Sequence, residues 1–192
     1  MKVVALNASA RKDGNTSILL NTVLTELRAE GMETELIQLG GETLYGCRAC
    51  YKCFETQDRH CVQKKDMLNN LLDKMLLADG ILLGSPTYFS DVTANMRAFI
   101  ERCGFVARAN DYMLKRKVGA SVVAVRRAGA IPAFSSMNLF LHYMQMVMPG
   151  SSYWSLGMGG GVGEVLNDEE GLQTMKTLGQ NMAWLMKKVA LP

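Results

Sequence analysis

The sequence lacks the features that would place it outside the compact globular proteins. Only four of its 192 residues are proline, 48% are hydrophobic and 20% are charged. This composition excludes disordered and fibrous chains, and the length predicts one domain that spans residues 1–192. No apolar run approaches the roughly 18 residues of a membrane helix, and the run at the N terminus is too short for a signal sequence. We therefore expect a cytoplasmic protein with no membrane partner.

The chain also lacks a strong charge of either sign. Its formal net charge is +3, and lysine and arginine are scattered singly or in pairs. Nucleic-acid-binding surfaces carry a basic stripe, so we expect no nucleic-acid partner. Neither G-x-G-x-x-G nor G-x4-G-K-[ST] occurs in the first turn, which disfavours a Rossmann dinucleotide site and a nucleoside triphosphatase.

Apolar segments alternate with helical stripes along the chain. Apolar runs without alternation are typical of parallel strands covered on both faces, and recurrence at i, i+3, i+4, i+7 is typical of helices that pack on a sheet. The predicted strands are residues 3–6, 34–39, 80–84, 118–125 and 151–155. The alternation predicts an α/β fold, a doubly wound parallel sheet with helices on both faces. Ligands of such sheets bind at the carboxyl ends of the strands.

The turn after the first predicted strand has the composition of a phosphate site. Small residues let backbone N–H groups turn inward, Arg11 adds positive charge, and the start of the next helix supplies a partial positive potential. Ser9, Thr16 and Ser17 carry hydroxyl groups that can donate to a phosphate. The alternative is an ordinary polar turn in which a Ser or Thr caps the helix.

The turn after the third predicted strand, at residues 84–90, carries two neighbouring aromatic residues. Tyr88 and Phe89 come to the same edge of the sheet as the first turn. Alone, an aromatic pair after a strand is more often core packing than a cofactor wall. Beside a phosphate site it indicates a planar ring, because a flavodoxin-like sheet of order 2-1-3-4-5 holds FMN in this way.

Four of the five cysteines lie within fifteen residues. Their spacing is C-x2-C-x2-C-x7-C, within a segment at about 40–65 that has no helical or strand period. Long irregular loops in compact domains are usually functional or disordered. Four thiolates at this spacing favour a [4Fe-4S] cluster over zinc, whose structural sites usually pair their cysteines as two separated C-x2-C units. The predicted ligands are Cys47, Cys50, Cys53 and Cys61.

Alternatives for the cysteines are free thiols or a redox disulfide between Cys47 and Cys50. Cys103 lies on an apolar helical stripe and is interpreted as a core residue. Positive charge near a cluster raises its reduction potential and favours docking of an acidic carrier, although a solvated loop has the same composition. The basic residues around the array are Arg48, Lys52, Arg59, Lys64 and Lys65.

Together these motifs resemble the flavodoxin-like NADPH-dependent FMN reductases and, within them, the iron-sulfur flavoproteins. The resemblance spans nearly the whole chain, including residues 163–181. It implies that the first turn holds the FMN phosphate, that the turn at residues 86–89 holds the isoalloxazine edge, and that the loop after the fourth strand completes the pocket. That loop has fewer glycines than the family pattern. The expected cofactor-binding residues are Ser9, Arg11, Asn15, Thr16, Ser17, Pro86, Thr87, Tyr88, Phe89, Arg127 and Gly129.

The predicted function is electron transfer by an FMN-dependent oxidoreductase. A cluster passes one electron and a flavin accepts one or two, so the pair can couple a ferredoxin-type carrier or NAD(P)H to a small acceptor. The resemblance implies a homodimer or homotetramer in which the cluster loop of one chain approaches the flavin of another. Two alternatives are a cluster-free NAD(P)H:FMN or quinone reductase, and a non-enzymatic flavodoxin-type electron carrier. The slightly basic charge disfavours the carrier, because flavodoxins are typically strongly acidic.

Overall fold

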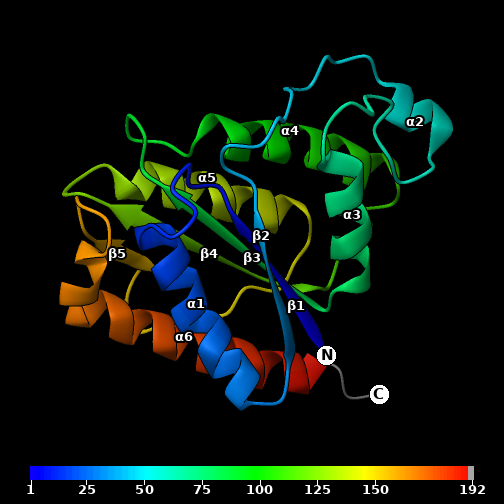
Figure 1. Ribbon diagram of the computed structural model, residues 1–192. Coiled ribbons are helices and arrows are strands. Elements are labelled where there is room, and N and C mark those ends of the chain that lie inside the picture. Colours follow the sequence, from blue (N-terminus) through cyan, green and yellow to red (C-terminus); the bar gives the residue numbers. More distant parts are fainter. Residues whose placement is uncertain (190–192) are drawn as a thin grey trace.

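Five parallel strands form one sheet of order β2-β1-β3-β4-β5 in the computed structural model, which describes residues 1–189 (Figure 1). This order confirms the predicted flavodoxin-like arrangement. The strands are β1 (Lys2–Asn7), β2 (Glu33–Gln38), β3 (Gly80–Pro86), β4 (Val118–Val125) and β5 (Leu156–Met158).

Helices cover both faces of the sheet (Figure 1). Helices α1 (Asn15–Ala29) and α6 (Glu169–Val189) pack against each other on one face, with the 3-10 helix η1 (Glu164–Asn167) beside them. The other face carries α3 (Leu68–Leu77), α4 (Ala94–Ala109) and α5 (Ala130–Tyr143), and the short helix α2 (Lys52–Thr56) contacts α4. None of these helices combines the length and the apolar character needed to cross a bilayer.

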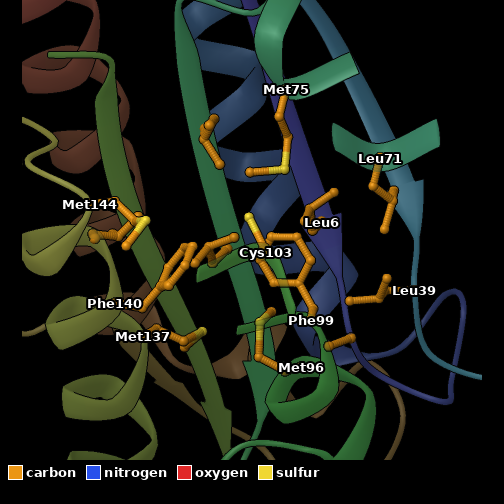
Figure 2. Close-up of a cluster of buried hydrophobic side chains, with 14 of the residues drawn as sticks. Leu6, Leu39, Leu71, Met75, Met96, Phe99, Cys103, Met137, Phe140 and Met144 are labelled. Carbon is orange, nitrogen blue, oxygen red and sulfur yellow. The ribbon is translucent and has the colours of Figure 1, made fainter. Parts of the chain in front are cut away.

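Two hydrophobic cores lie on the two faces, and strand alternation divides β1 between them. Val4 and Leu6 belong to the core under α3, α4 and α5, whereas Val3 and Ala5 belong to the core under α1 and α6. Figure 2 shows Leu6 beside Phe99 and Cys103 of α4. Cys103 is fully buried there, which confirms its interpretation as a core residue, and burial raises the pKa of its thiol.

The fifth strand was predicted too early in the chain. Residues 151–155 precede β5, whose three residues pair with Val123 to Val125 of β4. Aromatic residues 153 and 154 raise the strand propensity of the earlier segment, whereas β5 contains Gly157. A Cβ atom at Gly157 would lie 2.7 Å from Leu19 Cδ2 of α1, so this glycine lets α1 pack closely where propensity disfavours a strand.

The cysteine-rich loop is not wholly irregular, because it contains α2. Tyr51 and Gln57, which flank this five-residue helix, both have left-handed backbone conformations. A helix of little more than one turn has no detectable period in the sequence, which explains why it was not predicted. The loop containing α2 lies at one corner of the molecule, beside α3 and α4 (Figure 1).

Candidate functional site

A pocket, hereafter the edge pocket, lies at the carboxyl edge of the sheet. Its walls come from the first turn, the end of β3, the end of β4 and the loop after β5, although these segments are far apart in the sequence. Most of the predicted cofactor-binding residues are in it. The lining residues are Ser9, Arg11, Asn15, Thr16, Pro86, Thr87, Tyr88, Ala124, Arg126, Gly159 and Gly160.

The first turn presents the start of α1 to the edge pocket. Gly14 occupies the N-cap position, and within residues 1–189 no side chain caps this helix and no acidic residue lies in its first turn. The Thr16 side chain is buried, and its Oγ1 has no hydrogen-bond partner in that part of the chain. The ordinary capped turn is therefore not what forms. The N–H groups and the positive end of the helix dipole are available to an anion.

Two amide side chains, of Asn7 and Gln38, hold the first turn in shape. The Asn7 side chain accepts a hydrogen bond from Ser9 N (3.1 Å) and donates one to Gln38 Oε1 (2.9 Å). Gln38 Nε2 donates in turn to the carbonyls of Ser9 (2.6 Å) and Gly40 (2.7 Å). A Cβ atom at Gly40 would lie 2.1 Å from Ser9 O, so the turn packs directly on this glycine. These contacts fix the conformation of the first turn.

Asn15 has a role that the sequence did not indicate. Its Nδ2 donates to the carbonyls of Gly159 (2.9 Å) and Gly161 (2.8 Å), and its Oδ1 accepts from Gly163 N (2.9 Å). The amide therefore ties the glycine loop after β5 to the start of α1. A Cβ atom at Gly159 would lie 2.5 Å from Val165 N, so the loop comes close enough only as glycine. Asn15 thus builds a wall of the edge pocket.

The turn after β3 is held as a tight hairpin-like bend. Tyr88 N donates to Asp91 O (2.9 Å) and Asp91 N donates back to Tyr88 O (3.0 Å), while Phe89 and Ser90 between them have left-handed backbone (φ 48° and 60°). The Asp91 carboxylate accepts from Ser136 Oγ (2.8 Å) and pairs with Arg97. Phe89, at the tip, is fully exposed.

Phe89→Gly is expected to leave the free energy of unfolding within about 1 kcal/mol of wild type. A left-handed conformation costs a non-glycine residue roughly 1–2 kcal/mol, and glycine loses roughly 0.5–1 kcal/mol through unfolded-state entropy. Urea denaturation measures the difference. The matched control is Phe99→Ala in the core, with an expected loss of about 3–5 kcal/mol. A comparable loss for Phe89→Gly would show that the ring packs on the protein.

Four predicted residues lie outside the edge pocket. Ser17 Oγ accepts a hydrogen bond from Asn21 Nδ2 (3.3 Å) on α1, and Phe89 is beyond the rim. Arg127 is exposed, and Gly129 has φ 85° and caps α5. Arg126 lines the pocket where Arg127 was expected.

A second pocket, hereafter the cysteine pocket, contains all four clustered cysteines. Residues of the loop form most of it, and α4 closes it. The lining residues are Cys47, Arg48, Ala49, Cys50, Tyr51, Cys53, Cys61, Val62, Gln63, Arg102, Phe105 and Val106.

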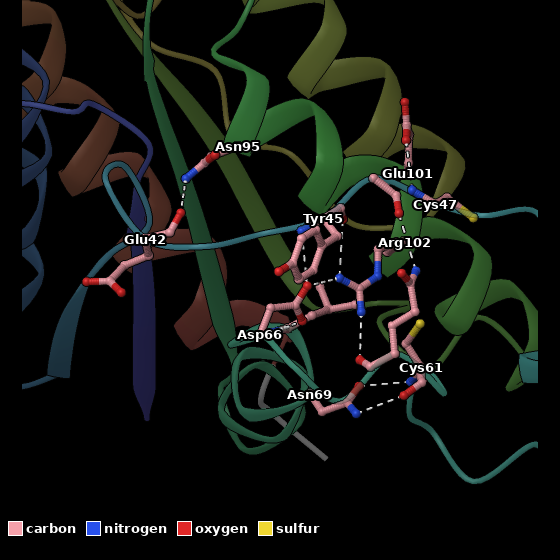
Figure 3. Close-up of polar contacts among 12 residues, drawn as sticks. Glu42, Tyr45, Cys47, Cys61, Asp66, Asn69, Asn95, Glu101 and Arg102 are labelled. Atoms are coloured by element: carbon pink, nitrogen blue, oxygen red, sulfur yellow. Dashed lines mark hydrogen bonds and ion pairs between the residues drawn. The ribbon is translucent and has the colours of Figure 1, made fainter.

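Helices α3 and α4 anchor both ends of the cysteine array. Cys47 N donates to Glu101 Oε2 (3.2 Å), whereas Asn69 exchanges two hydrogen bonds with the Cys61 backbone (2.8 and 2.9 Å; Figure 3). All five cysteines are free thiols. Burial and the neighbouring thiols raise the pKa of Cys53.

The four cysteines line the pocket, but they are not arranged as ligands of one ion. Within residues 1–189, no three Cys, His, Asp or Glu side chains are placed as ligands of a single ion. The four cysteines predicted as ligands line one pocket.

A five-stranded parallel sheet of this order, with a pocket at the carboxyl ends of its strands, is the flavodoxin-like arrangement. The model of the family described as NADPH-dependent FMN reductase matches residues 1–161, and the chain belongs to this family. It is therefore an FMN-dependent oxidoreductase of flavodoxin-like fold.

Relatives with similar length carry a more specific name. The chain is 33% identical to an "Iron-sulfur flavoprotein" of Methanocaldococcus jannaschii, covering 98% of this chain and 99% of that protein. An "Iron-sulfur flavoprotein" of Methanosarcina thermophila is 28% identical, covering 98% and 97%. Among solved structures, RosB with a bound riboflavin-5'-phosphate derivative superimposes with a TM-score of 0.75 at 18% identity, covering 98% of this chain and 80% of that one. This last likeness shows the fold.

Proposed function

We propose that this chain carries FMN in the edge pocket and a [4Fe-4S] cluster in the cysteine pocket, and that it transfers electrons between a donor and a small acceptor. One observation carries the proposal. Among the described residues, the buried side-chain N and O atoms without a hydrogen-bond partner are Thr16 Oγ1, Thr87 Oγ1 and Arg102 Nε. All three lie in these two pockets. A buried unpaired polar group costs about 1–3 kcal/mol, and a bound group that supplies the missing hydrogen bond removes this cost.

In the edge pocket, Arg11, Thr16 and the first N–H groups of α1 fit a phosphate. Thr87 and Tyr88 form the wall next to it and fit the edge of a flavin ring. Arg126 supplies a second positive charge in the same pocket. The flavin itself exchanges hydride or electrons, so these side chains bind and orient it and no acid-base residue is required.

In the cysteine pocket, the donor set fits a cluster because four thiols line one pocket. A [4Fe-4S] cluster has four irons at different corners and four cysteine ligands, so its thiolates do not meet at one ion. The name that the relatives carry supports the same group. The cluster supplies one-electron transfer when bound, and the protein positions it with the loop and α4.

The two pockets also bear on the proposed electron donor and on the proposed oligomer. They share no lining residue, which is consistent with a homodimer or homotetramer in which the cysteine loop of one chain faces the edge pocket of another. The proposed donor is NAD(P)H or a ferredoxin-type carrier. An acidic carrier fits the exposed basic residues of the loop, which are Arg48, Lys52, Arg59, Lys64 and Lys65.

Iron, acid-labile sulfide and FMN in anaerobically purified protein test the proposal. We expect about four iron and about four sulfide per FMN, as four-cysteine [4Fe-4S] ligation requires. Yellow, iron-free protein that NAD(P)H reduces would instead support a cluster-free FMN or quinone reductase. Stoichiometric zinc without sulfide would also reject the cluster.

A further inference from the structure

Arg102 is a charged side chain buried in the wall of the cysteine pocket. It projects from α4, its relative exposure is 1%, and it forms an ion pair with the equally buried Asp66 (Figure 3). Nη1 also donates to Tyr45 O (3.2 Å), and Nη2 donates to Gln63 O (2.9 Å). Tyr45 precedes the first clustered cysteine and Gln63 follows the last. One guanidinium group therefore holds both ends of the array.

The remaining donor of this guanidinium group has no partner among residues 1–189. Arg102 Nε is buried and unpaired, although both Nη atoms are used. Cys61, the last cysteine of the array, lies beside the group in the same pocket (Figure 3). Burial lowers the pKa of Arg102, but the ion pair with Asp66 opposes this effect and the pKa is raised overall. The side chain is charged, and it lines the same pocket as the four clustered cysteines.

Stability alone gives a weak reason for this arrangement. Taking an ion pair out of water costs much of what its attraction returns, and apolar residues of similar volume often serve as well. An arginine with an unpaired Nε is still less favourable, because that N–H loses its water contacts without replacement. A sulfur acceptor belonging to a bound group removes this penalty.

We propose that Arg102 is a positioning residue of the cluster site: Nε donates a hydrogen bond to the Cys61 sulfur or to a sulfide of the bound cluster, and the positive charge raises the cluster's reduction potential. The inference rests on the proposed function, because it requires the cluster. Hydrogen bonds to the sulfurs and the local charge are what set the potential of an iron-sulfur centre. Asp66 opposes the charge of Arg102 and thus moderates its effect.

The test compares cluster-loaded wild type with Arg102→Gln and Asp66→Asn. The midpoint potential is measured by a redox titration followed by electron paramagnetic resonance, together with iron, sulfide and FMN content. We expect Arg102→Gln to shift the cluster potential to more negative values, since a positive charge and a donor are lost. Asp66→Asn should shift it to more positive values, because the Arg102 charge is then less compensated.

Arg108→Gln is the matched control on the same helix. Arg108 is exposed and lies over the Phe54 ring at 5.8 Å from its centroid, so water screens its charge. Its removal should shift the potential much less than Arg102→Gln. If Arg102→Gln does not fold, Arg102→Lys provides the measurement, since it keeps the charge but lacks Nε and should still lower the potential.

Opposite shifts in Arg102→Gln and Asp66→Asn support the proposal, because a purely structural ion pair gives both variants the same defect. Equal loss of cluster from both, with FMN retained, would assign Arg102 to loop anchoring and overturn it. Unchanged midpoint potentials in cluster-loaded variants would also overturn the proposal. Wild-type protein without iron and sulfide would reject the proposed function itself, which is a distinct result.

Discussion

Cys50→Ala is expected to abolish iron binding while FMN content stays at the wild-type level. Cys50 is the exposed thiol of the array, between Ala49 and Tyr51, which both have left-handed backbone. Cys53 and Cys61 pack against the hydrophobic core, whereas Cys50 does not belong to that cluster within the described residues. Its replacement therefore removes a ligand with little disturbance of the fold. A cluster with three thiolates has one iron corner without its ligand.

The measurement is iron and sulfide per FMN after anaerobic purification. Cys103→Ala is the control, because it also removes one sulfur atom but in the core, away from the cysteine pocket. It should lower thermal stability and keep the full iron content. Retention of iron in Cys50→Ala, or its loss in Cys103→Ala, would reject the ligand assignment.

The double variant Arg11→Ala/Thr16→Ala is expected to weaken FMN binding by about 100-fold or more. A hydrogen bond to a charged group contributes about 1.5–3 kcal/mol, so loss of two donors corresponds to roughly 3 kcal/mol or more, with tenfold per 1.4 kcal/mol. Fluorescence titration of flavin-free protein measures the dissociation constant. Thr16 Oγ1 is buried and unpaired within residues 1–189, so the Thr16→Ala substitution breaks no hydrogen bond of the flavin-free protein.

Thr25→Ala/Arg28→Ala is the matched control. It also removes one arginine and one threonine, but from the end of α1 far from the edge pocket, where Arg28 Nη2 donates to Thr25 Oγ1 (3.0 Å). The control should bind FMN like wild type. Equal FMN affinities of the two double variants would reject the assignment of the phosphate site to the start of α1.

The sheet and the two pockets were largely predictable because their signals are local. Continuous apolar runs gave β1, β3 and β4 nearly to the residue, and the composition of the first turn indicated an anion site. The cysteine spacing alone placed four thiols in one pocket. Strand β5 was displaced because its edge position gives three paired residues and because Gly157 serves the packing of α1.

The residues that hold the pockets in shape were not predictable, since their partners are distant in the sequence. Asn15 bonds to a loop 144 to 148 residues away, and Arg102 pairs with Asp66 across 36 residues. Arg102 is next to the apolar stripe of α4 in the sequence, and a charged residue at such a position usually faces solvent. Whether Arg126 or Arg127 lines the pocket depends on the exact residue at which β4 ends. The periodicity of the sequence does not locate that residue.

The central claim is that the first turn binds the phosphate of a flavin. Parallel titrations of flavin-free protein with FMN and with riboflavin, which lacks the phosphate, measure that contribution directly. The account predicts binding of FMN about 100-fold or more tighter than riboflavin, consistent with several charge-assisted hydrogen bonds. Equal affinity for the two flavins, or no binding of either, would contradict it.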